Sequence, residues 1–202
     1  MSVRKQHWEH VYETKSPEQV SWTQAVPQTS LNFINKFNLP KSAAIIDIGG
    51  GDSLLVDFLL KEGFTDITVL DISEQALERA KARIGEKAGL VKWIVCDITE
   101  FKPEHHYTLW HDHATFHFLT TPDQINTYLQ IAAGAVDQYL IVATFSDNGP
   151  EKCSGLLIKQ YSEQDLQQTL AGNFKKIECL TEDHVTPFNT MQNFTFCSFE
   201  KV

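Results

Sequence analysis

The sequence lacks any apolar run of the roughly 18 residues that a membrane-spanning helix needs. Its first twelve residues are polar and contain no apolar core of a secretory signal. We therefore predict no membrane partner, no export and a cytoplasmic location.

Cysteine is scarce, and its spacing is unlike that of a metal-binding protein. The four cysteines lie far apart without a CxxC pair, and three of them sit within apolar runs: Cys96, Cys179 and Cys197. This pattern predicts buried free thiols in a reducing compartment and no structural metal.

Imidazoles gather in WHDHATFHF (110–118), but we predict no metal there either. We expect His111 and His113 to alternate onto opposite faces if the strand continues, and no further ligand is evident.

Basic residues are outnumbered, at 17 Lys and Arg against 26 Asp and Glu, for a net charge of −9. An acidic surface repels phosphate backbones, so we expect no nucleic-acid partner. The 202 residues, of which 42% are hydrophobic, suit a single domain spanning 1–202. We divide it into a helical N-terminal lid or extension (1–38) and an α/β core (39–202). The sequence leaves open whether the chain is a monomer or a homodimer.

Strand-like and helix-like segments alternate through the core. Helices are predicted at 53–62, 74–84, 123–133 and 162–170, and strands at 43–48, 66–70, 90–96, 107–111, 138–145, 175–180 and 193–200. Such alternation predicts a doubly wound, Rossmann-like α/β fold with three layers, α/β/α, and a seven-stranded mixed sheet. The last two strands have no helix between them, so we expect an antiparallel pair at one edge, joined by a loop over 182–190.

Three glycines, Gly49, Gly50 and Gly51, follow the first predicted strand in DIGGGDS (47–53). They let the backbone turn tightly and approach a ligand closely. The loop lacks the spacing of a dinucleotide fingerprint and the lysine of a P-loop. The flanking Asp47 and Asp52 would repel a pyrophosphate but tolerate a ligand that carries an amino group and a sulfonium centre.

A carboxylate also ends each of the next two strands, at Asp71 and Asp97. In an open parallel sheet these ends converge on one crevice. Asp71 can accept hydrogen bonds from both hydroxyls of a ribose. Asp97 and the amide of Ile98 can pair with the amino group and a ring nitrogen of adenine.

With these motifs, IIDIGGGDS (45–53), VLDIS (69–73) and VCDIT (95–99), the chain resembles the class I S-adenosylmethionine-dependent methyltransferases, of the type 12/25-like methyltransferase domain. The resemblance covers roughly residues 41–180; Ser53 stands where the usual GxGxG loop has its last glycine. It implies that Asp47 and the glycines contact the methionine part of the cofactor S-adenosylmethionine. The predicted cofactor-binding residues are Asp47, Gly49, Gly50, Gly51, Asp71, Ile72, Asp97, Ile98, Asp112 and Trp22.

The N-terminal stretch WEHVYETKSPEQVSW (8–22) is similar to the opening of a subgroup of these enzymes, some of which methylate protein lysines. Its aromatic residues either anchor the N-terminal helix or form a lid in which Trp22 packs near the sulfonium.

The resemblance implies methyl transfer by in-line displacement to a small molecule. Asp112 and His113, where the fourth strand ends, are the candidate catalytic residues, and Asp112 with Glu151 would suit an amine acceptor. Two alternatives stay open: a protein-lysine N-methyltransferase and a non-catalytic S-adenosylmethionine-binding or scaffold protein.

Overall fold

The computed structural model describes residues 2–202 and contains a seven-stranded mixed sheet with strand order β3-β2-β1-β4-β5-β9-β8. The strands are β1 (Ala44–Ile48), β2 (Asp66–Asp71), β3 (Val91–Val95), β4 (Tyr107–His113), β5 (Val136–Phe145), β8 (Phe174–Val185) and β9 (Met191–Lys201). The first five strands pair in parallel, whereas β9 runs antiparallel to both β5 and β8. The predicted fold class is confirmed.

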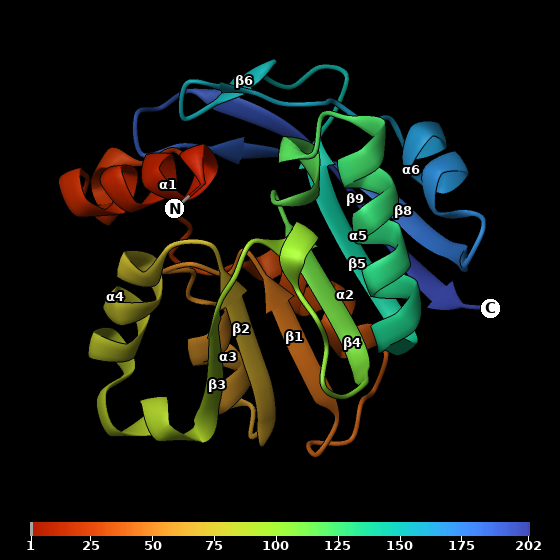
Figure 1. The fold of residues 1–202 in the computed structure, drawn as a ribbon, viewed down its shortest axis with the longest axis horizontal. Coiled ribbons are helices and arrows are strands. Elements are labelled where there is room, and N and C mark those ends of the chain that lie inside the picture. Colours follow the sequence, from red (N-terminus) through yellow and green to blue (C-terminus); the bar gives the residue numbers. More distant parts are fainter. Residues whose placement is uncertain (1) are drawn as a thin grey trace.

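Helices cover both faces of the sheet, which makes three layers (Figure 1). The helices are α1 (Val3–Thr14), α2 (Gln28–Lys36), α3 (Leu55–Lys61), α4 (Glu74–Ile84), α5 (Pro122–Ala135) and α6 (Glu163–Leu170). One core cluster joins apolar side chains of α2, α3 and α4 to the sheet, and the other joins those of α5 and α6 to its opposite face. Short 3-10 helices span Pro17–Gln19, Gly85–Leu90, Ile98–Glu100 and Phe116–Phe118.

Capping side chains fix where the helices begin. Ser73 accepts a hydrogen bond from the N–H of Ala76 at the start of α4, and Ser162 does the same for Asp165 in α6. The third helix begins two residues later than predicted, at Leu55, because the glycine loop continues through Ser53 as turn.

The C-terminal hairpin is longer than the sequence indicated. Strand β8 runs to Val185, paired with Met191, so the predicted loop shrinks to residues 186–190. A second, two-stranded sheet, β6 (Lys152–Cys153) with β7 (Leu156–Leu157), lies in the loop that follows β5. Two-residue strands carry no periodicity, which is why the sequence did not reveal them.

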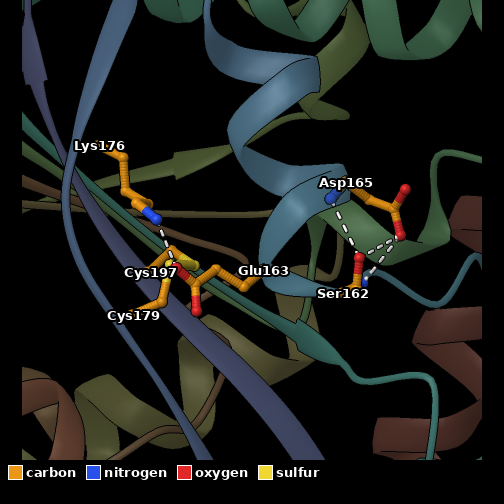
Figure 2. Close-up of a disulfide and its surroundings, with 6 residues drawn as sticks. All are labelled: Ser162, Glu163, Asp165, Lys176, Cys179 and Cys197. Atoms are coloured by element: carbon orange, nitrogen blue, oxygen red, sulfur yellow. Dashed lines mark hydrogen bonds and ion pairs between the residues drawn. A yellow bond between two sulfur atoms is a disulfide. The ribbon is translucent and has the colours of Figure 1, made fainter.

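Two of the four cysteines form a disulfide, which corrects the prediction of free thiols (Figure 2). Cys179 on β8 lies directly opposite Cys197 on β9, with their Cα atoms 4.1 Å apart. Cys96 and Cys153 are free. The spacing of 18 residues gave no sign of the bond because a long hairpin, and not a short motif, aligns the two positions. Figure 2 also shows the ion pair between Lys176 on β8 and Glu163 on α6.

Within residues 2–202, none of the helices is both long enough and apolar enough to cross a bilayer.

Candidate active site

A cavity of about 360 Å³ opens at the carboxyl ends of β1, β2 and β4. Parallel strands point their carboxyl ends to the same side, so residues from distant parts of the chain meet there. Nine of the predicted site residues line it: Trp22, Asp47, Gly49, Gly50, Asp71, Ile72, Asp97, Ile98 and His113. Gly51 and Asp112 are not among its lining residues.

Two glycines of the loop combine a positive φ with a lack of room for a side chain. Gly49 has φ +64°, and a Cβ there would lie 1.7 Å from the hydroxyl oxygen of Thr115. Gly51 has φ +49°, and a Cβ there would lie 2.6 Å from the hydroxyl oxygen of Tyr12. A side chain at either position would collide with a cavity-lining residue, which explains the glycine run physically. Gly51 thus lets the loop pack closely against Tyr12 of α1.

Asp47 is held in place by a buried chain of polar contacts. Nδ1 of His111 lies 2.7 Å from Oδ1 of Asp47, and Nε2 of His111 lies 2.9 Å from Oγ of Ser30 on α2. All three side chains are buried, and His111 and Asp47 also line the cavity. This chain of contacts fixes the direction of the Asp47 carboxylate.

Asp71 is a buried carboxylate whose pKa is raised to about 7. Burial is the main cause, and the carboxylates of Asp52 and Asp47 add to it. The backbone N–H of Ser73, which donates to Oδ1 of Asp71 at 2.8 Å, acts in the opposite direction. Asp71 is therefore a hydrogen-bond acceptor that is only partly ionised at neutral pH.

Asp97 already has partners on both oxygens. Its Oδ1 accepts hydrogen bonds from the N–H and the hydroxyl of Thr99, at 3.0 and 2.8 Å. Its Oδ2 forms an ion pair with Nη2 of Arg4, at 2.7 Å. Arg4 belongs to α1, so the N-terminal helix reaches the place where the sequence predicted adenine.

Helix α1 also contacts the beginning of α4. The carboxylate of Glu9 accepts hydrogen bonds from the Ser73 hydroxyl (2.7 Å) and from the N–H groups of Glu74 (2.9 Å) and Gln75 (3.1 Å). Burial alone would raise the pKa of Glu9, but these donors together with Lys5 lower it overall. An ionised Glu9 therefore stabilises the positive end of α4 and ties α1 over the cavity.

Replacing Glu9 with glutamine is expected to lower the free energy of unfolding by about 1 kcal/mol, the usual value of a charged helix cap. For a chain of this size the melting temperature would fall by roughly 3 °C. Amide hydrogen exchange in α1 would accelerate more than in β1. The control is Glu13→Gln on the exposed side of the same helix; equal effects of both changes would show that Glu9 has no special role.

The structure corrects the prediction for Asp112, because the carboxylate of this residue lies on the face of the sheet that points away from the cavity. Alternate residues of a strand face opposite sides, so His111 and His113 face the cavity while Asp112 does not. Its oxygens accept hydrogen bonds from the N–H groups of Thr115 and Phe116 and from the hydroxyl of Tyr128. Asp112 therefore stabilises the turn after β4 and does not face the cavity.

The prediction that His111 and His113 face opposite sides was wrong for the same reason: residues two apart on a strand share a face. Their rings lie 6.4 Å apart, and both line the cavity. Glu151 is exposed and does not line the cavity, so the amine pocket proposed from Asp112 and Glu151 does not exist.

Several cavity residues were beyond sequence reasoning. Trp8, Tyr12 and Phe118 line the cavity together with Trp22 and form an aromatic cluster in which Trp8 lies 5.8 Å from Trp22 and 5.1 Å from Phe118. The sequence showed that Trp8 and Tyr12 are four residues apart, but nothing in it placed Trp8 against Phe118.

A family model described as a methyltransferase domain matches residues 45–136. Over this segment the chain is similar to a methyltransferase domain. The matched segment begins within β1 and ends where β5 begins, so it contains all four acids that line the cavity: Asp47, Asp52, Asp71 and Asp97.

The chain is also similar in sequence to known methyltransferases over part of their length. The chain is 32% identical over 105 residues to the malonyl-[acyl-carrier protein] O-methyltransferase of Anoxybacillus flavithermus, covering 51% of this chain and 39% of that protein. It is 29% identical over 94 residues to the mouse EEF1A lysine methyltransferase 2, covering 43% of this chain and 38% of that protein. The chain thus matches about two fifths of the length of these curated relatives.

A likeness in fold to a solved methyltransferase extends over nearly the whole chain. The 1,6-didemethyltoxoflavin-N1-methyltransferase of Burkholderia thailandensis, solved with 1,6-didemethyltoxoflavin and S-adenosylhomocysteine bound, superposes with a TM-score of 0.74 at 18% identity. The superposition covers 99% of this chain and 88% of the other. Helix α1 and the C-terminal hairpin therefore belong to the shared architecture, beyond the segment that the family model matches.

Proposed function

We propose that the protein is an S-adenosylmethionine-dependent methyltransferase that transfers a methyl group to a small molecule. The observation that carries this proposal is the meeting of Asp47, Asp71 and Asp97 with the glycine loop around one cavity. The match to a methyltransferase domain over residues 45–136 supports it.

The polar groups that line the cavity fit S-adenosylmethionine. Asp71 would accept the hydroxyls of the ribose, and Asp97 with the N–H of Ile98 would bind the adenine. Asp47, Gly49 and Gly50 would contact the methionine part, whose ammonium group suits an acidic wall. The aromatic face of Trp22 would attract the sulfonium. Ile72 would pack against the nucleoside from the loop after β2.

When bound, S-adenosylmethionine supplies a methyl group that its sulfonium charge already activates. What the chain itself must do is align the acceptor and exclude water. Helix α1 serves the second task, because Arg4, Trp8 and Tyr12 close one side of the cavity. We therefore propose that residues 1–38 act as a lid on a single domain formed by the whole chain.

A second candidate is transfer to a protein lysine. It is supported by the 29% identity to the mouse EEF1A lysine methyltransferase 2 over 94 residues.

Two measurements test the proposal together. Calorimetry on the purified chain should show binding of S-adenosylmethionine and S-adenosylhomocysteine, with no heat from NADH. Methyl-labelled S-adenosylmethionine added to a cell lysate should then yield label in the small-molecule fraction. Label in protein would favour the lysine alternative, and binding without any transfer would favour the scaffold alternative. Absence of cofactor binding would contradict the assignment as a whole.

The cytoplasmic location stays a prediction of the sequence, as do the absence of a nucleic-acid partner and the choice between monomer and homodimer. The disulfide argues against the cytoplasm, since such bonds persist mainly in oxidising compartments.

A further inference from the structure

One wall of the cavity carries no ionised side chain. The carboxylates and guanidinium groups that line the cavity belong to the glycine loop, the ends of β1, β2 and β3, and helices α1 and α4. The wall at the β4 end of the cavity, next to Asp47 and His111, is formed by the segment before α2, the last residue of β4 with the turn that follows it, and β6. Its lining residues are Trp22, Thr23, Gln24, Pro27, His113, Ala114, Phe118, Leu119 and Cys153.

Both titratable groups of this wall are uncharged at neutral pH. Burial, and then the imidazoles of His111, His184 and His117, lowers the pKa of His113 to about 3. Burial raises the pKa of the Cys153 thiol to about 12. The wall therefore offers an ionic group in the acceptor no counter-charge.

His113 is a polar group of this wall that is free to bind an acceptor; within residues 2–202 the buried Nε1 of Trp22 also lacks a hydrogen-bond partner. The ring of His113 packs between the side chains of Phe194 and Phe196, at 5.2 and 4.9 Å between ring centres, which fixes its position. Within residues 2–202 it makes no hydrogen bond, and neither ring nitrogen is sealed from the cavity. By contrast, His111 has both ring nitrogens occupied by Asp47 and Ser30.

On the basis of the proposed methyl transfer, we infer that the acceptor is a small uncharged aromatic molecule whose protic group hydrogen-bonds to His113. Its ring would pack against Trp22 and Phe118. An ammonium bound here would gain a cation–π contact with Trp22 but no ion pair, and a carboxylate would gain neither, while both ions would lose their hydration. This wall therefore selects against acidic acceptors and against the ammonium form of a lysine.

Binding to the protein saturated with S-adenosylhomocysteine tests this inference without relying on turnover. The probes share one ring and differ in charge: benzyl alcohol, benzylamine and benzoate. We expect benzyl alcohol to bind at least about tenfold more tightly than either ion at pH 7. Benzylamine should gain affinity as the pH rises and its neutral fraction grows. Equal or tighter binding of either ion at pH 7 would overturn the inference.

His113→Phe tests the hydrogen bond separately. It should weaken benzyl alcohol about fivefold, the value of one neutral hydrogen bond, while toluene binds as before. His113→Asn, which keeps a donor and an acceptor, should restore part of the loss. His106→Phe, at the exposed beginning of β4, is the matched control and should change neither probe. An unchanged affinity of His113→Phe for benzyl alcohol would contradict the assigned contact.

The proposed methyltransferase function and the inferred acceptor class can be contradicted separately. If S-adenosylhomocysteine itself does not bind, the proposed methyltransferase function is wrong. If it binds and the charged probes win, only the acceptor class is wrong.

Discussion

Replacing Asp71 with asparagine is expected to raise the dissociation constant for S-adenosylmethionine by about 100-fold. The two ribose hydroxyls would lose charge-assisted hydrogen bonds worth about 3 kcal/mol together. Calorimetry measures this directly. The control is Asp66→Asn at the opposite end of the same strand, where the side chain lies far from the cavity. Affinity of the Asp71 variant within about threefold of the original protein would contradict the role of Asp71.

The raised pKa of Asp71 adds a pH signature to this prediction. Because the pKa is about 7, roughly half of the unliganded protein carries a proton on Asp71 at pH 7. Hydroxyl donors favour the carboxylate form, so cofactor binding should release up to about half a proton at that pH. Affinity should rise with pH up to about 7 and then level off. Calorimetry in buffers of different ionisation enthalpy counts the protons, and Asp71→Asn should abolish the release.

The raised pKa of Asp71 also makes its contribution to the free energy of unfolding of the unliganded protein depend on pH. A folded pKa above the unfolded value means that the native state keeps a proton that the unfolded chain has lost. The contribution of Asp71 to the free energy of unfolding therefore falls as the pH rises from about 4 towards 7, and it is constant above that range.

Reducing the disulfide is expected to lower the free energy of unfolding by about 3 kcal/mol, since Cys179 and Cys197 close a loop of 18 residues. The melting temperature should fall by roughly 6–12 °C. Thermal unfolding with and without a reductant measures the difference. The double variant Cys179→Ala and Cys197→Ala should show no dependence on reductant.

A thiol titration under denaturing conditions gives an independent check. Without reductant it should detect two thiols, those of Cys96 and Cys153. Four reactive thiols would show that the bond does not form in the purified protein. That result would support the prediction, made from the sequence, of free thiols in a reducing compartment.

The layered fold and the acidic end of the cavity could be predicted from the sequence because both depend on local patterns. Alternating strand and helix periods define a parallel sheet, and each of Asp47, Asp71 and Asp97 stands at or just beyond the end of a strand. Once strands are parallel, topology alone brings such residues together. That is why three acids spread over fifty residues were assigned to one crevice.

Side-chain direction at the end of β4 was predictable in principle but was misjudged. The two-residue repeat of a strand already separates Asp112 from His111 and His113. The position of Asp112 after the strand had suggested a role in the site. Its contacts with Thr115, Phe116 and Tyr128 assign it to the turn.

What the sequence by itself determined is therefore the order of the elements and the acids and glycines that those elements deliver to one edge of the sheet. Only the tertiary structure decided which partners meet across long separations: Arg4 with Asp97, Glu9 with the start of α4, and Cys179 with Cys197. Such contacts depend on how α1 and the last hairpin dock. Docking is set by the packing of many side chains together, and no local repeat in the chain records it.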